Sequence, residues 1–169
     1  MPLQLDLAPA AGFFALMATA AVEDIRRLVI PNGVIVGLCL LWPFHLATAP
    51  NATIAAGMAS IGCAVTVFFA GALSFLRGLI GGGDVKLLAA ATLWAGPDRI
   101  LPLLALMGLL GGLLGLFVLS PICLDFLGLR RRLPTGPSEI TAVLTKPVVP
   151  YGVAIATAAL IVTILPSFG

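Results

Sequence analysis

Two aspartates stand out because their positions suit acid–base chemistry. Asp24 directly follows the first long apolar run of the chain, and Asp84 follows three consecutive glycines at positions 81–83. Two carboxyl groups brought close together do not both ionise readily, so one of them retains a proton. Such a pair can activate water as a general base and protonate a leaving amine as a general acid, which is the chemistry of aspartic proteases.

Other reactive side chains form no comparable group. His45 is the only histidine and lies towards the far end of the second apolar run, where we expect a packed or solvated residue. Cys39, Cys63 and Cys123 lie within apolar runs without a C-x-x-C pair, so neither zinc ligation nor a structural disulfide is expected. The chain also lacks G-x-S-x-G, P-loop and dinucleotide-binding patterns. We therefore predict no metal and no organic cofactor.

The composition indicates a membrane protein. Of the 169 residues, 60% are apolar and only 9% are charged, and the mean hydropathy is +1.17. Soluble domains typically have about 45–50% apolar and about 25% charged residues, so this chain has too few charges to cover the surface of a soluble globule. A net charge of only +2, with the arginines between apolar runs, argues against nucleic-acid binding.

Charge-free runs locate the candidate membrane spans, since a helix needs about 20 apolar residues to cross the hydrocarbon core. They are Leu7–Val22, Leu28–Ala49, Ala52–Leu76, Leu87–Pro97, Ile100–Leu124 and Val148–Phe168. The fourth run is short, and we expect it to recruit Leu79–Lys86, with this end facing protein or water because lipid cannot satisfy open backbone. We predict an all-α, polytopic membrane protein of about six transmembrane helices in a single domain, residues 1–169.

The flanking charges predict the orientation. If the runs alternate sides, Arg99 stands alone on one side, and the other side receives Arg26, Arg27, Arg77, Lys86, Arg130, Arg131, Arg132 and Lys146. The positive-inside rule places the basic side in the cytosol and both termini outside it. Trp42 and Trp94 then lie near the outer ends of their spans, where indoles are enriched.

The first run is expected to be retained in the mature protein. Asp6 stands where a signal peptide carries Lys or Arg, although Ala18-Thr19-Ala20 resembles a cleavage site. The longest polar stretch is Asp125–Pro147, for which we expect a turn and a short interfacial helix over Ser138–Lys146. Its arginines at 130–132 suit an anchor for anionic lipid headgroups, with a contact to substrate as the alternative.

Each polar residue near the two aspartates also has a purely structural interpretation. Asp24 paired with Arg27, or Asp84 paired with Lys86, would be ordinary interfacial ion pairs. The three glycines permit close approach of an extended peptide, and they equally permit a hinge or close helix packing. Pro31 suits the first turn of the second span, and Asn32 suits a cap or a hydrogen bond between helices.

Together these segments resemble the type IV prepilin peptidase family, the membrane-embedded aspartic proteases with a GxGD motif. Asp24, Arg26 and the sequence Ile30-Pro31-Asn32 match the first family motif. The second is matched by Gly81, Gly83 and Asp84, with Lys86 in the family's lysine position. Lys146 and Pro150-Tyr151-Gly152 are similar to a late Pro-aromatic-Gly element of the family.

The resemblance implies removal of the short basic leader from prepilins and pseudopilins, after a glycine, at the cytosolic face of the bacterial inner membrane. Asp24 and Asp84 would be the catalytic pair. Arg26 and Lys86 would tune these carboxyl groups or hold the substrate, unless they serve only topology. Pro31, Asn32, Gly81 and Gly83 would support the site or bind substrate.

One departure from the longer members of the family concerns a second activity. Those members carry an additional cytosolic domain with paired C-x-x-C motifs and also N-methylate the new terminus. Here only Glu23–Arg27 separates the first two expected spans, and there is no cysteine pair. The chain resembles the short, peptidase-only form associated with Flp/Tad-type pili, and methyltransferase activity is not expected.

Two other classes of function compete with the peptidase. A small proton- or cation-coupled transporter would use the same two carboxylates as its ion site, because intramembrane carboxylates and glycine-interrupted helices occur in both classes. A carrier site should lie near the bilayer midplane, whereas both aspartates are predicted at the cytosolic boundary. A pure assembly protein of the pilus machine would need neither aspartate.

Overall fold

The computed structural model describes residues 7–49, 53–119 and 150–164. All regular structure in these segments is helical, so the all-α prediction is confirmed for them. Several predictions fall outside the described residues: those for Asp6, Cys123 and Lys146, for the arginines at 130–132, and for a short helix over Ser138–Lys146.

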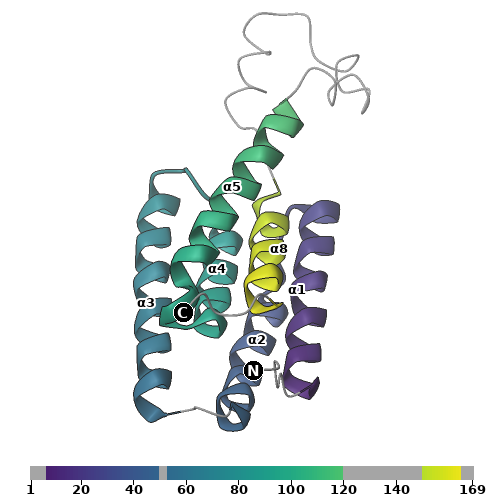
Figure 1. Ribbon diagram of the computed structural model, residues 1–169. Helices are drawn as coiled ribbons and strands as arrows, with labels where there is room; N and C mark the ends of the chain where they lie inside the picture. Colours follow the sequence, from purple (N-terminus) through teal and green to yellow (C-terminus); the bar gives the residue numbers. More distant parts are fainter. Residues whose placement is uncertain (1–6, 50–52, 120–149, 165–169) are drawn as a thin grey trace, which may run out of the picture.

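The described helices form one bundle (Figure 1). They are α1 (Leu7–Arg27), α2 (Asn32–Thr48), α3 (Ile54–Leu76), α4 (Gly82–Ala95), the 3-10 helix η1 (Pro97–Arg99), α5 (Ile100–Leu119) and α8 (Tyr151–Ile164). Helix α4 packs on α3, α2 and α8, while α8 also packs on α1 and α5. In this arrangement α1 and α3 end at the end of the bundle that is uppermost in Figure 1, and α4 and α8 begin at that same end.

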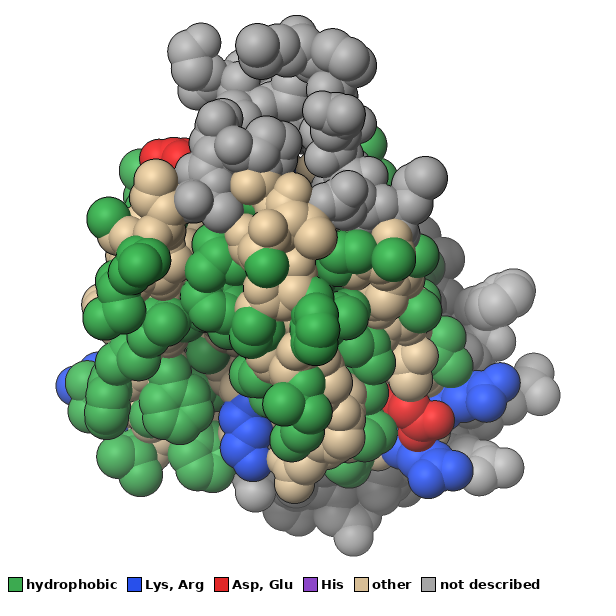
Figure 2. Space-filling model, turned by 90° about the horizontal axis from the view of Figure 1, so that it is seen from below, with side chains coloured by type: hydrophobic (Ala, Val, Ile, Leu, Met, Phe, Trp, Pro, Cys, Tyr) green, Lys and Arg blue, Asp and Glu red, His purple; other side chains and the backbone are tan. Residues whose placement is uncertain are grey.

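Three segments are long and apolar enough to cross a membrane: Ala8–Arg27, Ile54–Leu76 and Gly82–Phe117. Helices α2 and α8 are apolar but shorter. Large hydrophobic side chains such as Leu40, Phe69 and Leu116 are exposed on the outside of the bundle. Figure 2, which views the bundle from below, shows many hydrophobic side chains and few charged ones. An apolar exterior of this kind is suited to lipid rather than to water.

Helix α1 ends later than the charge pattern predicts. The apolar run stops at Val22, but the helix continues through Asp24 to Arg27. The next residue, Leu28, terminates the helix: its backbone is left-handed (φ 54°), and its N–H donates to the Asp24 carbonyl oxygen at 2.9 Å. Charge-free runs report contact with lipid, whereas a helix ends where its backbone hydrogen bonds end. Asp24 therefore belongs to the last turn of α1 rather than to the connection after it.

The starts of α2 and α4 also differ from, or refine, the expected spans. Pro31 is the N-cap residue of α2 with extended backbone (φ −63°, ψ 134°), so it stands one position before the first turn in which it was expected. Helix α4 begins at Gly82 and includes Asp84 and Lys86, so the short fourth run recruits Gly82–Lys86 and not the whole expected stretch Leu79–Lys86.

The core is built around α8. Its buried positions are mostly small, including Gly152, Ala154, Ala156, Ala158 and Ala159. Small side chains let helices approach closely within a membrane bundle. The largest fully buried apolar side chains come from the surrounding helices as well as from α8 itself, namely Phe13, Met17, Leu38, Leu87, Leu103 and Ile155. Packing on α8 therefore fixes the relative positions of α1 and α4, which carry the two aspartates.

Candidate active site

Asp24 is the most deeply buried charged residue among those that the structure describes, with 5% of its surface exposed. It lies in the last turn of α1, where α1 packs on α8. Its Oδ2 atom is fully buried and has no hydrogen-bond partner within the described residues. The backbone amides of Gly152 and Val153, in the first turn of α8, face its carboxyl group.

Asp84 lies in the first turn of α4, three residues after the N-cap Gly81. Its carboxyl group interacts with the backbone N–H of Gly81, which is the half of a capping box that an acidic residue at this position supplies. An acidic group at a helix N-terminus is also favoured by the helix dipole. The local sequence therefore accounts for the conformation of Asp84.

The bundle brings the two carboxyl groups together. Asp24 and Asp84 are 60 positions apart in the sequence, but they lie close enough for their charges to interact. Both lie at the end of the bundle where α1 stops and α4 starts. The sequence left the separation of these two residues open, and the packing of the helices brings them into electrostatic range.

The expected ion pairs between the aspartates and nearby bases do not form. Arg27 Nε instead lies 3.3 Å from Glu23 Oε2, one turn earlier on α1. Lys86 Nζ donates a hydrogen bond to Asn32 Oδ1 at 3.1 Å. Arg26 is exposed on the surface of α1. Neither of these two ion pairs, Asp24 with Arg27 or Asp84 with Lys86, is therefore present.

Asn32 and Lys86 tie α2 to α4 beside Asp84. Their hydrogen bond joins two residues 54 positions apart, so Asn32 serves as a link between helices, one of the two roles expected for it. The adjacent Ile30 is buried and lies against Gly83, where an added Cβ would be 3.3 Å from Ile30 Cβ. Gly83 thus permits the connection between α1 and α2 to pack closely on the first turn of α4.

Gly81 has a different neighbour. A Cβ added there would lie 2.8 Å from Asp84 Oδ2, which is closer than real Cβ contacts allow. The absence of a side chain at position 81 therefore leaves room for the Asp84 carboxyl group to fold back on its helix cap.

Sequence reasoning missed the start of α8 as part of this site. Pro150-Tyr151-Gly152 is similar to a family element, but no role in the site was predicted for it, and Gly152 lies directly against Asp24. The clue in the sequence is that this element and Asp24 were both predicted at the cytosolic ends of their spans. Nothing in the sequence indicated that α8 would pack on α1.

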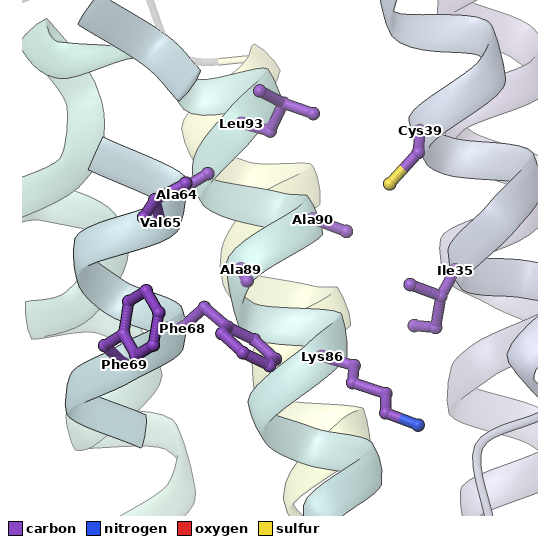
Figure 3. Close-up of a pocket in the computed structure, with 10 residues that line it drawn as sticks. All are labelled: Ile35, Cys39, Ala64, Val65, Phe68, Phe69, Lys86, Ala89, Ala90 and Leu93. Atoms are coloured by element: carbon purple, nitrogen blue, oxygen red, sulfur yellow. The ribbon is translucent and has the colours of Figure 1, made fainter. Parts of the chain in front are cut away.

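A cavity of about 280 Å³ lies between α2, α3 and α4 (Figure 3). Ile35 and Cys39 line it from α2, and the other lining residues are Ala64, Val65, Phe68, Phe69, Lys86, Ala89, Ala90 and Leu93. Lys86, two residues after Asp84, lies at one end of this otherwise apolar cavity. Lys86 is thus the one charged side chain among the residues that line this cavity.

Metal ligation has no support in the described part of the chain. Those residues contain no group of three or more His, Cys, Asp or Glu side chains that could hold an ion. Cys39 and Cys63 are free thiols. His45 stacks on Trp94 with ring centroids 4.8 Å apart, which confirms the packed role expected for it.

A comparison with protein families finds one match that covers both aspartates and the residues around them. The model described as the type IV leader peptidase family matches residues 11–116. The chain belongs to the type IV leader peptidase family. The protein is therefore a peptidase, and its apolar helices make it a multi-pass membrane protein.

The other two comparisons add no relatives, because no curated protein and no solved structure matches this peptidase. The family match ends at residue 116 and does not include α8. Helix α8 belongs to the candidate site through its contacts with Asp24 and α1.

Proposed function

We propose that this peptidase is an aspartic endopeptidase that removes the leader peptide of type IV prepilins, with Asp24 and Asp84 as its catalytic pair. The observation that carries the proposal is the interaction of these two carboxyl groups at one end of the bundle. Membership of the leader peptidase family supplies the class of reaction and of substrate.

The proposed reaction needs one charged and one protonated carboxyl group. The charged carboxylate takes a proton from water, whose oxygen attacks the carbonyl carbon of the scissile peptide bond. The protonated carboxyl group gives its proton to the leaving amine nitrogen, so the C–N bond breaks and the leader leaves with a new carboxyl terminus. Close carboxyl groups favour this division of roles, because mutual repulsion opposes a second negative charge.

The position of the pair supports cleavage at a membrane boundary. Asp24 is in the last turn of α1 and Asp84 is in the first turn of α4. We propose that this end faces the cytosol, that the protein lies in a bacterial inner membrane, and that both termini lie outside the cytosol. A transporter would need its ion site near the bilayer midplane, so the position of the pair favours the peptidase.

The finer assignment concerns the type of pilus. We propose the short, peptidase-only form of Flp/Tad systems, with one transmembrane peptidase domain over residues 1–169 and about six spans. Its support is the short connection between α1 and α2, which comprises only residues 28–31 and leaves no room for an inserted domain there. N-methylation of the product is not part of this proposal.

The test is a cleavage assay in membranes. The protein is co-expressed with a prepilin from the same genome, and the size shift of the prepilin is followed for wild type, Asp24→Asn and Asp84→Asn. Asp98→Asn is the matched control, because Asp98 lies in η1 at the other end of α4. Cleavage by wild type and by the control, lost in both test variants at normal membrane levels, supports the proposal. Cleavage that survives in either test variant removes that residue from the catalytic pair.

A further inference from the structure

The Asp24 carboxyl group is held by its surroundings rather than by a complete set of hydrogen bonds. Its Oδ2 atom is buried and makes no hydrogen bond within the described residues. A buried polar atom left without a partner destabilises the folded protein. The direction of this carboxyl group therefore depends on the groups that pack around it.

The first turn of α8 is one such neighbour. The backbone amides of Gly152 and Val153 face the carboxyl group of Asp24. The Val153 N–H also donates to the Pro150 carbonyl oxygen at 3.2 Å. The first N–H groups of a helix have no acceptor within the helix, and their positive end attracts a carboxylate. Of the two amides, that of Gly152 is therefore the better placed to act on Asp24.

The approach of α8 to Asp24 requires a residue without a side chain. A Cβ added at Gly152 would lie 2.7 Å from Oδ2, 2.9 Å from Cγ and 3.1 Å from Cβ of Asp24. These atoms include the root of the side chain as well as its tip, so a simple rotation of the carboxyl group does not relieve the overlap. A methyl group at position 152 must displace Asp24, α8 or both.

Helix α5 in turn holds the start of α8. A Cβ added at Gly111 of α5 would lie 2.8 Å from Cε1 and 3.0 Å from Cδ1 of Tyr151. The Tyr151 ring is rigid and precedes Gly152 directly. A methyl group at Gly111 would therefore press on the first turn of α8 without touching Asp24. At Gly112, the next position of α5, an added Cβ meets nothing within 4 Å.

We infer that Gly152 is a positioning residue of the peptidase: the first turn of α8, braced on α5 through Tyr151, holds the Asp24 carboxyl group against Asp84. This inference rests on the proposed function, because it assumes that Asp24 takes part in cleavage. It adds a third segment to the site, from a part of the chain beyond the family match.

The experiment measures kcat, KM and the pH profile of kcat for cleavage of a prepilin by the purified full-length enzyme. For Gly152→Ala we expect kcat to fall about 100-fold, the effect of a misplacement of roughly 1 Å, with KM little changed. Gly111→Ala should cause a smaller fall through Tyr151. Gly112→Ala is the matched control and should retain the wild-type kcat and KM.

The pH profile separates positioning from loss of folded protein. A smaller folded fraction scales kcat equally at every pH, whereas a displaced Asp24 changes its electrostatic interaction with Asp84 and shifts the profile. A shifted profile in Gly152→Ala supports the inference. Wild-type kcat, or a uniformly scaled profile, overturns it.

Two further outcomes are distinguishable. If Gly152→Ala does not accumulate, Gly111→Ala decides: a shifted profile supports the inference, and wild-type behaviour overturns it. If Asp24→Asn retains cleavage under the same conditions, the proposed function fails for Asp24 and the inference fails with it. If Asp24→Asn is inactive and Gly152→Ala is not impaired, only the inference fails.

Discussion

The two ends of the bundle differ in whether key polar groups have hydrogen-bond partners among the described residues. At the end where α2 and α4 finish, Trp94 stacks on Phe13 and His45, with ring centroids 4.5 Å and 4.8 Å apart. Its indole N–H donates to the Leu38 carbonyl oxygen at 3.0 Å. Arg99 donates to the carbonyl oxygens of Val162 and Thr163 at the end of α8. These side chains join α1, α2, α4 and α8 at this end of the bundle. The indole N–H of Trp94 and the guanidinium group of Arg99 both have hydrogen-bond acceptors there.

At the opposite end, a buried carboxyl oxygen of Asp24 has no partner within the described residues. The charge of Asp24 also acts on Asp84, and glycines leave room beside each aspartate. Interactions of this kind reduce stability, and they are expected where a protein performs chemistry. This difference supports the proposal that the same helices serve stability at one end and catalysis at the other.

The largest effect is expected when an aspartate of the pair is removed. Removing either carboxyl group should lower kcat by about 10²–10⁴-fold, the usual contribution of general acid–base catalysis. The double variant Asp24→Asn/Asp84→Asn should be no less active than the worse single variant, because residues that act as one unit are not additive. The measurement is single-turnover cleavage of a prepilin. Losses that multiply would indicate that the two residues act independently.

A smaller effect is expected at Gly81. In Gly81→Ala the new Cβ would lie 2.8 Å from Asp84 Oδ2, so the carboxyl group must move, and kcat should fall at least about tenfold. Gly82→Ala is the neighbouring control, because its Cβ would meet only the Phe75 ring at 3.4 Å. The comparison of kcat at equal amounts of folded enzyme checks this prediction. Equal activities of the two variants would contradict it.

The link between Asn32 and Lys86 should matter less. Loss of its hydrogen bond in Asn32→Ala or Lys86→Met is expected to lower kcat/KM about fivefold, corresponding to roughly 1 kcal/mol. The double variant should resemble the single variants, because each removes the same interaction. The measurement is a double-mutant cycle on cleavage rates. Additive losses would show that Lys86 acts elsewhere, for example on a substrate in the cavity of Figure 3.

The smallest effect on activity is expected at the other end of the bundle. Trp94→Phe keeps an aromatic ring between Phe13 and His45 but loses the hydrogen bond to Leu38. We expect a loss of about 1 kcal/mol in the free energy of unfolding and kcat unchanged within about twofold. Thermal unfolding in detergent and the cleavage assay provide the two values. A fall in kcat as large as that of Gly81→Ala would remove the distinction between the ends.

Several features of the fold were predictable because they depend on neighbouring residues alone. The apolar composition indicates membrane helices, and the charge-free runs locate every described α-helix. Helix ends were less predictable. The charge-free run ends at Val22, but α1 does not end there, because its backbone hydrogen bonds continue to Arg27. Pro31 likewise stands at the N-cap of α2, one position before its expected place.

The amino-acid sequence by itself determined which side chains are available for chemistry, and it determined the conformation of Asp84. Gly81 and Asp84 lie three residues apart, so their interaction at the start of α4 needs only one helical turn. The two motif segments, with their aspartates 60 positions apart, were also readable from the sequence.

Only the tertiary structure decided what surrounds those side chains. In the folded protein Lys86 hydrogen-bonds to Asn32 and not to Asp84. Arg27 pairs with Glu23 and not with Asp24. The tertiary structure also placed Gly152 against Asp24 across 128 positions of sequence. The physical reason is that nearly every helix here is apolar on all sides, so hydrophobic periodicity does not specify which faces meet. Close packing of small residues on α8 makes that choice.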